Sequence, residues 1–330
     1  MKENEIRPQS LVKRQKQVFL EDAKMLANKK NEFIDVACPA CGSNGSEPVF
    51  QKQGFGYVSC KNCETIYINP RPTKEILAQY YANSKNYEFW NKFIFPASEK
   101  VRKEKIFSPR AARVIEACKE CGVNTNFLLE VGSGFGTFCE EVKRHGLFKR
   151  IAGVEPTPDL AETCRKKGIE VFEMPIEEVS LENGSVNVIA AFEVIEHLFS
   201  PEEFLTKCRN LLAPGGIVII TCPNAKGLDI SVLKENSDAV DHEHLNYFNV
   251  ESIASLLKKC GFGIIKAATP GELDAEIVRK KALAGEFDIK KQPFLNSVLI
   301  EHWEELGGAF QEFLKQNKLS SHMQIIARKA

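Results

Sequence analysis

Eleven residues near the middle of the chain, LLEVGSGFGTF at 128–138, constrain its fold more than any other segment. An apolar run ends in an acid, and three glycines follow at alternate positions, Gly132, Gly134 and Gly136. Glycine permits backbone conformations and close approaches that a Cβ atom would prevent. A strand that runs into a glycine-rich turn and then into a helix is the first unit of a Rossmann-like fold, which predicts a ligand site at this turn.

The chain beyond this loop alternates between strand-like and helix-like stretches. Seven strands are expected, in the sequences FLLEVG, RIAGVEP, EVFEM, SVNVIAAF, GIVIITCPN, FGIIKAAT and HMQIIARK. Helical stretches separate most of them, which predicts an α/β fold with a mostly parallel sheet and helices on both faces. Residues 272–320 interrupt the alternation with added helices, of which WEELGGAFQEFLKQN is the clearest.

Four cysteines upstream of this region form two Cys-x-x-Cys pairs, separated by eighteen residues. They are Cys38, Cys41, Cys60 and Cys63. Two such pairs predict a zinc-ribbon module in which four thiolates bind tetrahedral Zn²⁺. Because the thiolates fill the coordination shell, we expect a structural ion and not a catalytic one. A third pair, Cys118 and Cys121, has no partner pair, and we interpret it as helix packing, with a redox role as the alternative.

These patterns divide the chain into five parts. We expect a helical arm at 1–35, a zinc-binding module at 36–72, a helical linker or lid at 73–122, a Rossmann-like core at 123–271, and C-terminal helices with a final strand at 272–330. Ser10 and Ser98 are candidate N-caps of helices, and Gly122 is a candidate stop signal.

Charge and hydropathy exclude several classes of function. Forty-four Lys and Arg residues balance forty-four Asp and Glu residues, so no basic excess suggests a nucleic-acid partner. No apolar stretch approaches the length needed to span a bilayer, and the N-terminus has no apolar segment of the kind found in secretory signals. We therefore expect a cytoplasmic protein whose cysteines are mostly reduced.

The residues around the glycine loop narrow the choice of ligand. The spacing is not the G-x-G-x-x-G of dinucleotide sites, and no G-K-[ST] follows, which excludes a Walker phosphate loop. Glu155 ends the second strand about 20 residues past the loop, where a carboxylate can accept hydrogen bonds from both ribose hydroxyls. Glu130 precedes the loop, where it either orients the loop or faces an ammonium group. The alternative is a tight turn that binds no ligand.

LEVGSGFG, AGVEP, FEVIEHL and LLAPGGIVIITCPN, in this order, resemble the class I S-adenosylmethionine (SAM)-dependent methyltransferases over about residues 127–265. The resemblance implies that the loop holds the methionine end of SAM and that Glu155 binds its ribose. It also implies that Pro175 and Ile176 border the adenine and that Phe192 and Glu193 lie beneath the sulfonium. The candidate SAM-binding residues are Glu130, Gly132, Ser133, Gly134, Gly136, Glu155, Pro156, Pro175, Ile176, Phe192, Glu193, Tyr81 and Tyr87.

Methyl transfer to a hydroxyl or to a carbon acid requires a base that removes a proton. His197 follows the fourth strand, and His242 and His244 follow the fifth, at the sheet edge where ligands bind in open α/β folds. We expect His244 to be the leading base, assisted by Glu243 or Asp241, while His197 orients the acceptor or is the alternative base. Structural histidines, or a metal bound by the DHEH segment, are the alternatives. No site is expected at the remaining histidines, His145, His302 and His322.

A narrower resemblance joins the four-cysteine module, a tyrosine-bearing helical segment, the SAM core and the segment EHLNYF. Together they resemble bacterial sugar methyltransferases, including nucleotide-sugar C-methyltransferases. The resemblance matches that family's Glu-His pair to Glu243 and His244, and its histidine after the fourth strand to His197. Asp241 replaces the family's tyrosine, and NPRPT and LSSHMQIIARK look like methyltransferases of surface-polysaccharide gene clusters. We therefore expect O-methylation of a sugar, free, nucleotide-activated or glycan-linked.

The tyrosines of the helical segment have two interpretations. The resemblance implies that they close over SAM or the substrate, with Tyr81 and Tyr87 as the preferred contacts. Alternatively, Tyr80, Tyr81 and Tyr87 pack the zinc module onto the core, as aromatic residues at helical spacing commonly do. Three other functions remain as alternatives to sugar O-methylation: C-methylation of a nucleotide-sugar, methylation of a small aromatic or quinone-like acceptor, and SAM binding without catalysis.

Overall fold

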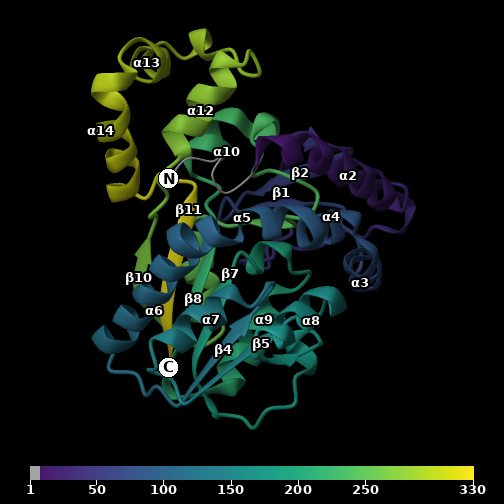
Figure 1. Cartoon of the computed structure of the whole chain (residues 1–330). Coiled ribbons are helices and arrows are strands. Elements are labelled where there is room, and N and C mark those ends of the chain that lie inside the picture. The colour runs from purple at the N-terminus through teal and green to yellow at the C-terminus, as the bar shows by residue number, and fades with distance from the viewer. Residues whose placement is uncertain (1–7) are drawn as a thin grey trace.

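The computed structural model describes residues 8–330, so the first part of the expected N-terminal arm, residues 1–7, lies outside the described chain (Figure 1). Helix α2 (Gln9–Ala27) forms the rest of this arm, and a 3₁₀ turn at Lys30–Glu32 follows it. Pro8 occupies the N-cap position of α2, so the prediction that Ser10 caps this helix is wrong. Proline is favoured at helix starts because it has no N–H group to leave unpaired.

The core of the fold is a seven-stranded sheet. Its strands are β4 (Phe127–Val131), β5 (Arg150–Val154), β6 (Glu170–Phe172), β7 (Val186–Phe192), β8 (Leu212–Pro223), β10 (Phe262–Ala268) and β11 (His322–Lys329). Their order is β10-β11-β8-β7-β4-β5-β6, and only β11 runs antiparallel to its neighbours. The seven predicted strands and the mostly parallel sheet are confirmed, and this is the Rossmann-like topology of class I methyltransferases.

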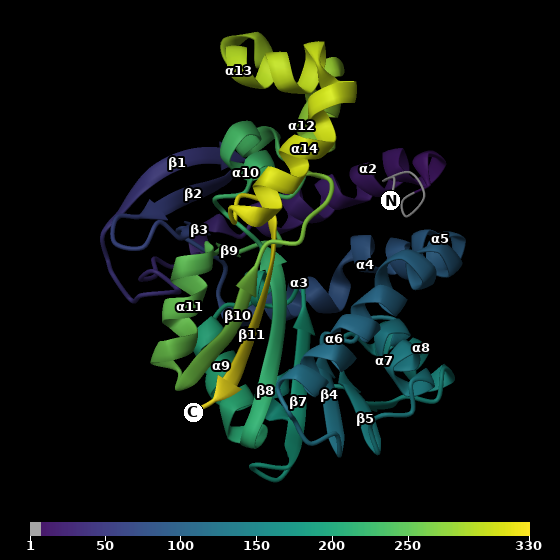
Figure 2. The ribbon, with the colours of Figure 1, turned by 90° about the vertical axis from the view of Figure 1, so that its left-hand side faces the viewer.

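Helices cover both faces of this sheet (Figure 2). On one face lie α6 (Ser108–Glu120), α7 (Thr137–Arg144) and α8 (Pro158–Lys166); on the other lie α9 (Pro201–Leu211) and α11 (Val250–Lys259). Successive residues of β4 pack into different cores, since Leu128 joins the cluster with α6 and α7, whereas Leu129 joins the cluster with α9 and α11. Burial on both faces explains why the central strands are continuous apolar runs.

A second, four-stranded antiparallel sheet carries the cysteine pairs. It consists of β1 (Ser46–Lys52), β2 (Phe55–Cys60), β3 (Ile66–Ile68) and β9 (Asn246–Tyr247). Strand β9 comes from the segment that follows β8, so the four-cysteine module and the residues just after DHEH share one sheet. The buried guanidinium of Arg71 strengthens this junction, because it donates hydrogen bonds to the carbonyl oxygens of Ile68 and Leu245.

The linker between the two sheets is a run of helices: α3 (Lys74–Asn83), α4 (Lys85–Phe89), a π-helical turn (Trp90–Ile94), α5 (Phe95–Arg102), a second π-helical turn (Lys103–Phe107) and α6. Thr73 and Ser84 cap α3 and α4 through their side chains. Ser98 lies inside α5, where its hydroxyl donates to the Ile94 carbonyl, so the prediction that it starts a helix is wrong. The stop at Gly122 is confirmed, because α6 ends at Glu120 and Gly122 has a φ of +61°.

The C-terminal helices form a separate apolar cluster beyond the end of the main sheet (Figure 2). They are α10 (Leu228–Leu233), α12 (Asp274–Leu283), α13 (Pro293–Asn296), a π-helical turn (Ser297–Glu301) and α14 (Trp303–Gln316). Short 3₁₀ turns lie at Ile176–Glu178, Ile195–His197, Lys234–Asn236 and Ile289–Lys291. Across residues 8–330, no helix combines the length and the apolar character needed to cross a membrane.

Candidate functional site

The glycine loop connects β4 to α7 with all three of its glycines in the left-handed region, at φ values of +71°, +51° and +67°. A Cβ atom on Gly132 would lie 2.6 Å from the Val194 side chain, and one on Gly136 would lie 3.1 Å from the Cys164 sulfur. A Cβ atom on Gly134 would meet nothing within 4 Å. Gly132 and Gly136 are thus required by packing, whereas Gly134 leaves the backbone open to a ligand.

Glu155 lies at the carboxyl end of β5 and is tied to this loop. Its side chain is 5% exposed, and its two carboxylate oxygens accept hydrogen bonds from the backbone N–H groups of Gly134 at 2.8 Å and Thr157 at 2.9 Å. Burial raises the pKa of this carboxyl above its ordinary value. Beside it, Pro156 is exposed, as is Pro175, whereas Ile176 is buried.

Two further acids lie at the ends of β4 and β7. Glu130 accepts a hydrogen bond from the Cys139 thiol at 3.0 Å, and burial raises the pKa of Glu130 to about 8. Glu193 has a φ of +55°, and its carboxylate accepts a hydrogen bond from the Thr221 hydroxyl at 2.6 Å. Although burial opposes ionisation, His322 and other neighbours hold the pKa of Glu193 below its ordinary value.

His322 was expected to have no partner, and this expectation is wrong. Its Nδ1 atom lies 3.4 Å from the carboxylate of Glu193, because β11 pairs with β8 and carries His322 to the carboxyl edge of the sheet. The guanidinium of Arg110 lies 4.4 Å from the centre of the Phe192 ring. These two basic side chains lie more than 200 residues apart in the chain, so no local sequence pattern could show that they flank Glu193 and Phe192.

His197 and His244 meet edge to face, with ring centres 4.6 Å apart. The Nδ1 atom of His197 lies 3.0 Å from the Glu243 carbonyl oxygen, and that of His244 lies 2.9 Å from the Ala239 carbonyl oxygen. A carbonyl only accepts, so each Nδ1 carries the proton and each Nε2 carries a lone pair. Burial and the neighbouring His244 lower the pKa of His197 to about 3, so His197 is neutral near pH 7.

His242 points away from this pair. It is 0% exposed, its ring lies 4.5 Å from that of Phe19, and its nitrogens contact the Tyr80 hydroxyl at 2.9 Å and the Gln53 side chain at 3.1 Å. His242 and His244 therefore do not converge as two ligands of one metal ion.

The two acids proposed to assist His244 have different surroundings. Asp241 accepts hydrogen bonds from the backbone N–H groups of Glu243 and His244, and its second oxygen lies 3.7 Å from the His244 Nδ1 atom. The Glu243 carboxylate points toward the lid instead, where the Tyr80 hydroxyl donates to it at 2.6 Å and the Asn86 amide at 3.5 Å. Burial and the charge of Asp241 raise the pKa of Glu243 to about 8.

The lid places several aromatic side chains near the glycine loop. The rings of Tyr81 and Tyr87 lie 5.9 Å apart, and the Tyr81 hydroxyl is buried without a hydrogen-bond partner among the described residues. The Phe95 ring of α5 stacks on the Phe135 ring of the loop, with centres 3.6 Å apart and planes 6° apart. Phe135 was missed in the sequence, although an aromatic residue between two loop glycines is an available signal.

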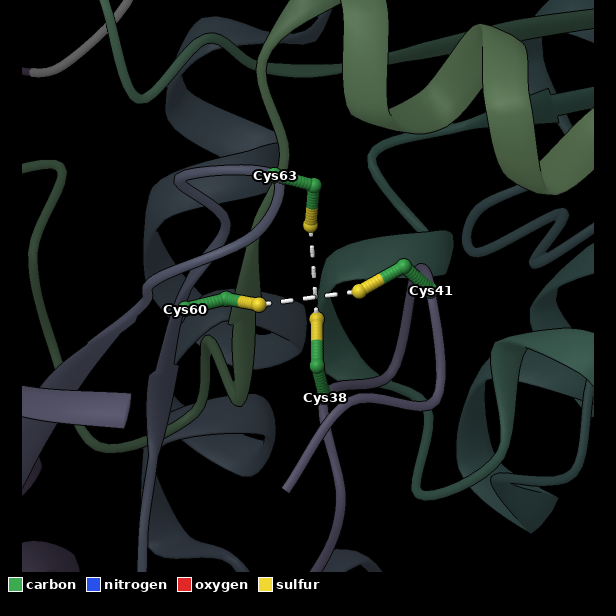
Figure 3. Close-up of side chains that lie close together, drawn as sticks. All are labelled: Cys38, Cys41, Cys60 and Cys63. Atoms are coloured by element: carbon green, nitrogen blue, oxygen red, sulfur yellow. Dashed lines mark hydrogen bonds between the residues drawn. The ribbon is translucent and has the colours of Figure 1, made fainter. Parts of the chain in front are cut away.

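The four expected metal ligands converge from two turns (Figure 3). The sulfurs of Cys38 and Cys63 lie 3.5 Å apart, as do those of Cys41 and Cys60, and all four cysteines are free of disulfide bonds. Sulfurs bound tetrahedrally to zinc at about 2.3 Å lie about 3.8 Å from one another. The two distances of 3.5 Å are close to this value, and all four sulfurs lie within 4.8 Å of one another, so the cluster could hold this ion.

The two cysteine turns have the same backbone geometry. In each, the residue four positions after the first cysteine is left-handed, Gly42 at +75° and Glu64 at +57°, and its N–H donates to the carbonyl of that cysteine at 2.9 Å. The first cysteine of each turn, Cys38 or Cys60, donates its own N–H to the carbonyl of the residue five positions later. Two matching turns that face each other are typical of zinc ribbons. By contrast, Cys118 is buried in the α6 core, which confirms its packing role.

Residues 99–267, half of the chain, match the family described as Methyltransferase domain, and the chain belongs to this family. It is 26% identical over 150 residues to the C-methyltransferase NovU of Streptomyces niveus, which covers 44% of this chain and 34% of NovU. It is 33% identical over 104 residues to a ubiquinone biosynthesis O-methyltransferase of Caulobacter sp., which covers 29% of this chain and 40% of that protein. These matches span well under two thirds of either relative.

The fold also resembles a solved methyltransferase from a complex with the Trm112 methyltransferase activator of Haloferax volcanii. The TM-score is 0.51 at 11% sequence identity, over 74% of this chain and 97% of the other. At this identity the likeness concerns the fold alone, and it agrees with the seven-stranded topology described above.

Proposed function

We propose that this protein transfers a methyl group from SAM to a hydroxyl group of a sugar, either nucleotide-activated or glycan-linked. The observation that carries the proposal is the position of His197 and His244. Their free Nε2 atoms belong to the segments that follow β7 and β8, at the same sheet edge as the glycine loop and Glu155. Family membership supports methyl transfer, and a neutral imidazole near that loop supports an acceptor that must lose a proton.

The residues around the glycine loop fit SAM. SAM supplies a methyl group that is already activated on a sulfonium, so the protein mainly has to align the reactants. The open backbone at Gly134 would receive the methionine end, and the Glu155 carboxylate retains lone pairs that can accept from ribose hydroxyls. The negative charges of Glu193 and Asp241, whose pKa values are both held low, complement the positive sulfonium.

The same fit extends to the remaining SAM contacts. Pro156, Pro175 and Ile176 would border the adenine, and Tyr81 and Tyr87 would cover the site from the lid. Glu130 lies beneath the loop, where its bond to Cys139 ties β4 to α7. We assign it to the support of the loop and not to an ammonium contact.

His244 is the better placed base of the pair. Its Nδ1 atom faces the Ala239 carbonyl and the Asp241 carboxylate, so a positive imidazolium would be stabilised from that side. His197 is a weak base, because burial and the neighbouring His244 hold its pKa near 3. In the proposed reaction the acceptor proton moves to the His244 Nε2 atom while the acceptor oxygen bonds to the methyl carbon and the carbon–sulfur bond breaks. His197 would orient the acceptor.

The four cysteines would bind one structural Zn²⁺. Their turns begin and end strands of the small sheet, and this sheet includes β9, which directly follows His244 in the chain. The ion would therefore stabilise the small sheet against which the segment containing His244 packs. Four thiolate ligands would leave no open coordination position for catalysis.

The test is a turnover assay with purified protein, SAM and a panel of nucleotide-hexoses, with mass spectrometry of the products. We expect one methyl group on one hexose, and a loss of about 10²–10⁴-fold in turnover for His244→Ala with unchanged SAM affinity. His145→Ala, at an exposed helix end, is the matched control. Full turnover in His244→Ala would overturn the base assignment, and SAM binding without any product would favour a non-catalytic SAM-binding protein.

A second candidate is C-methylation of a nucleotide-sugar. It is favoured by the similarity to NovU, which is described as a C-methyltransferase, and by the Glu243–His244 pair. NMR separates the two candidates, because an O-methyl group and a methyl group on a ring carbon differ in carbon chemical shift. C-methylation also requires loss of a ring proton, which deuterium exchange in D₂O would report.

A further inference from the structure

Glu196 is a buried acid that the proposed reaction does not yet use. Its side chain is 0% exposed, and neither carboxyl oxygen has a hydrogen-bond partner of acceptable geometry among residues 8–330. A buried polar group without a hydrogen-bond partner lowers the stability of the folded protein. Native proteins rarely leave such a group unpaired unless it binds something.

The surroundings of Glu196 indicate what it binds. One of its carboxyl oxygens lies in a group with one nitrogen of His197 and one of His244, all within 4.8 Å of one another. Because both Nδ1 atoms are engaged by backbone carbonyls, the free nitrogens are the two Nε2 atoms. Each Nε2 atom presents a lone pair that can only accept a hydrogen bond.

We propose that Glu196, His197 and His244 form a subsite for a vicinal diol, so that the acceptor carries two adjacent hydroxyl groups. This inference rests on the proposed methyl transfer and names the acceptor chemistry. Two imidazole lone pairs require two O–H donors, and adjacent hydroxyls supply them about 2.8 Å apart. The hydroxyl that donates to His244 is the one that is methylated, and its neighbour donates to His197.

Glu196 completes the hydrogen bonding of the diol. Burial and the nearby charge of Glu193 raise the pKa of Glu196 well above its ordinary value, which favours the protonated carboxyl. A carboxylic acid offers one O–H donor, which a diol oxygen can accept, and one carbonyl oxygen. Both imidazole lone pairs and the Glu196 O–H group then have a partner on the diol.

A divalent cation is the competing occupant of the same three residues. Two ligands bound at about 2.1 Å from one ion lie at most about 4.2 Å apart. Two hydrogen bonds of about 2.8 Å to one oxygen span up to about 5.6 Å, so hydroxyls fit three atoms that lie within 4.8 Å of one another. A divalent ion would also stand near the positively charged sulfonium of SAM, and like charges repel.

The first experiment is a crystal structure of the complex with S-adenosylhomocysteine, soaked with glycerol as the simplest vicinal diol and, separately, with MnCl₂. Two adjacent oxygens within about 3.2 Å of the three side chains support the proposal. An empty subsite in the glycerol soak would overturn it. So would an anomalous manganese peak bonded to Glu196, His197 and His244, because the three residues would then belong to a cation site.

The second experiment measures binding by calorimetry in the presence of S-adenosylhomocysteine. The probes are dTDP-glucose with its monodeoxy analogues, and catechol with phenol. We expect loss of one hydroxyl of a vicinal pair to weaken binding at least about 10-fold in the native protein, because a site built to bind a hydroxyl rejects the analogue that lacks it. Comparing the sugar probes with the catechol and phenol probes shows whether the subsite binds the diol of a sugar or that of an aromatic ring.

Variants of Glu196 decide whether this residue is responsible. Glu196→Leu should abolish the discrimination against the deoxy analogue, whereas Glu196→Gln, which keeps a donor and an acceptor, should retain most of it. Glu141→Gln, at a buried acid of α7 paired with Arg144, is the matched control and should behave as the native protein. Unchanged discrimination in a folded Glu196→Leu protein would overturn the proposal. Diol binding without methylated product would refute the proposed function alone.

Discussion

Replacing Glu243 by glutamine should make the stability of this protein less dependent on pH. Burial raises the pKa of this carboxyl to about 8 in the folded protein, against about 4.3 in an unfolded chain. The folded state therefore holds the proton more tightly. The contribution of Glu243 to the free energy of unfolding is fully present below pH 4.3 and is lost as the pH rises through 8. Between pH 6 and pH 8 this loss amounts to about 2 kcal/mol.

The assay is urea unfolding of the zinc-loaded protein at several pH values from 6 to 9, followed by the fluorescence of its two tryptophans. The free energy of unfolding of Glu243→Gln minus that of the native protein should rise by about 2 kcal/mol from pH 6 to pH 8 and then level off. Titrating groups that do not interact with Glu243 contribute equally to both proteins, so their contributions cancel in this difference. Glu304→Gln, at an exposed position on α14, should give a constant difference. A constant difference for Glu243→Gln as well would refute the conclusion that Glu243 is buried with a raised pKa.

Three further changes test the metal centre and the SAM site. Native mass spectrometry should find one zinc ion in the native protein and in Cys118→Ser but none in Cys41→Ser, which should also lower turnover more than SAM affinity. Equal metal content in the two variants would contradict the site. Glu155→Gln should weaken SAM binding about 10–100-fold in calorimetry, because hydrogen bonds to a charged group are worth about 1.5–3 kcal/mol; unchanged affinity would exclude a ribose contact. Gly136→Ala should lower the free energy of unfolding by about 1–3 kcal/mol, because residue 136 has a left-handed φ and the new Cβ atom would press against α8. Gly134→Ala should weaken SAM binding more than Gly136→Ala does.

The features that could be predicted from the sequence depend on local pattern. The seven strands were visible because buried parallel strands are unbroken apolar runs bounded by turn residues. The cysteine turns were visible because the ligand spacing is fixed by the geometry of the metal. The prediction that Ser98 is an N-cap was wrong because two π-helical turns join the flanking helices into one continuous run from Lys85 to Glu120. Nothing in the sequence around Ser98 indicates these turns.

The parts of the site that escaped prediction depend on contacts between distant segments. His322 reaches Glu193 only because β11 inserts beside β8, and a pairing between strands about a hundred residues apart leaves no local signal. Glu196 precedes a histidine that was singled out, yet its importance comes from having no partner, which only packing can show. Tyr80 was weighed as a packing residue, but it connects the lid to Glu243 and His242.

The four-cysteine module and the segment that contains His244 depend on each other for their positions. Strand β3 pairs with β9, and the Tyr57 hydroxyl of β2 donates to the Asp241 carbonyl at 2.7 Å. Gln53, in the β1–β2 turn, contacts His242, so three points of the small sheet hold the segment that contains His244. The three strands that the cysteine module itself contributes, β1, β2 and β3, have little core of their own, and four thiolates on one ion would supply the missing rigidity. A metal ion bound by these cysteines would thus help to fix where the acceptor meets its base.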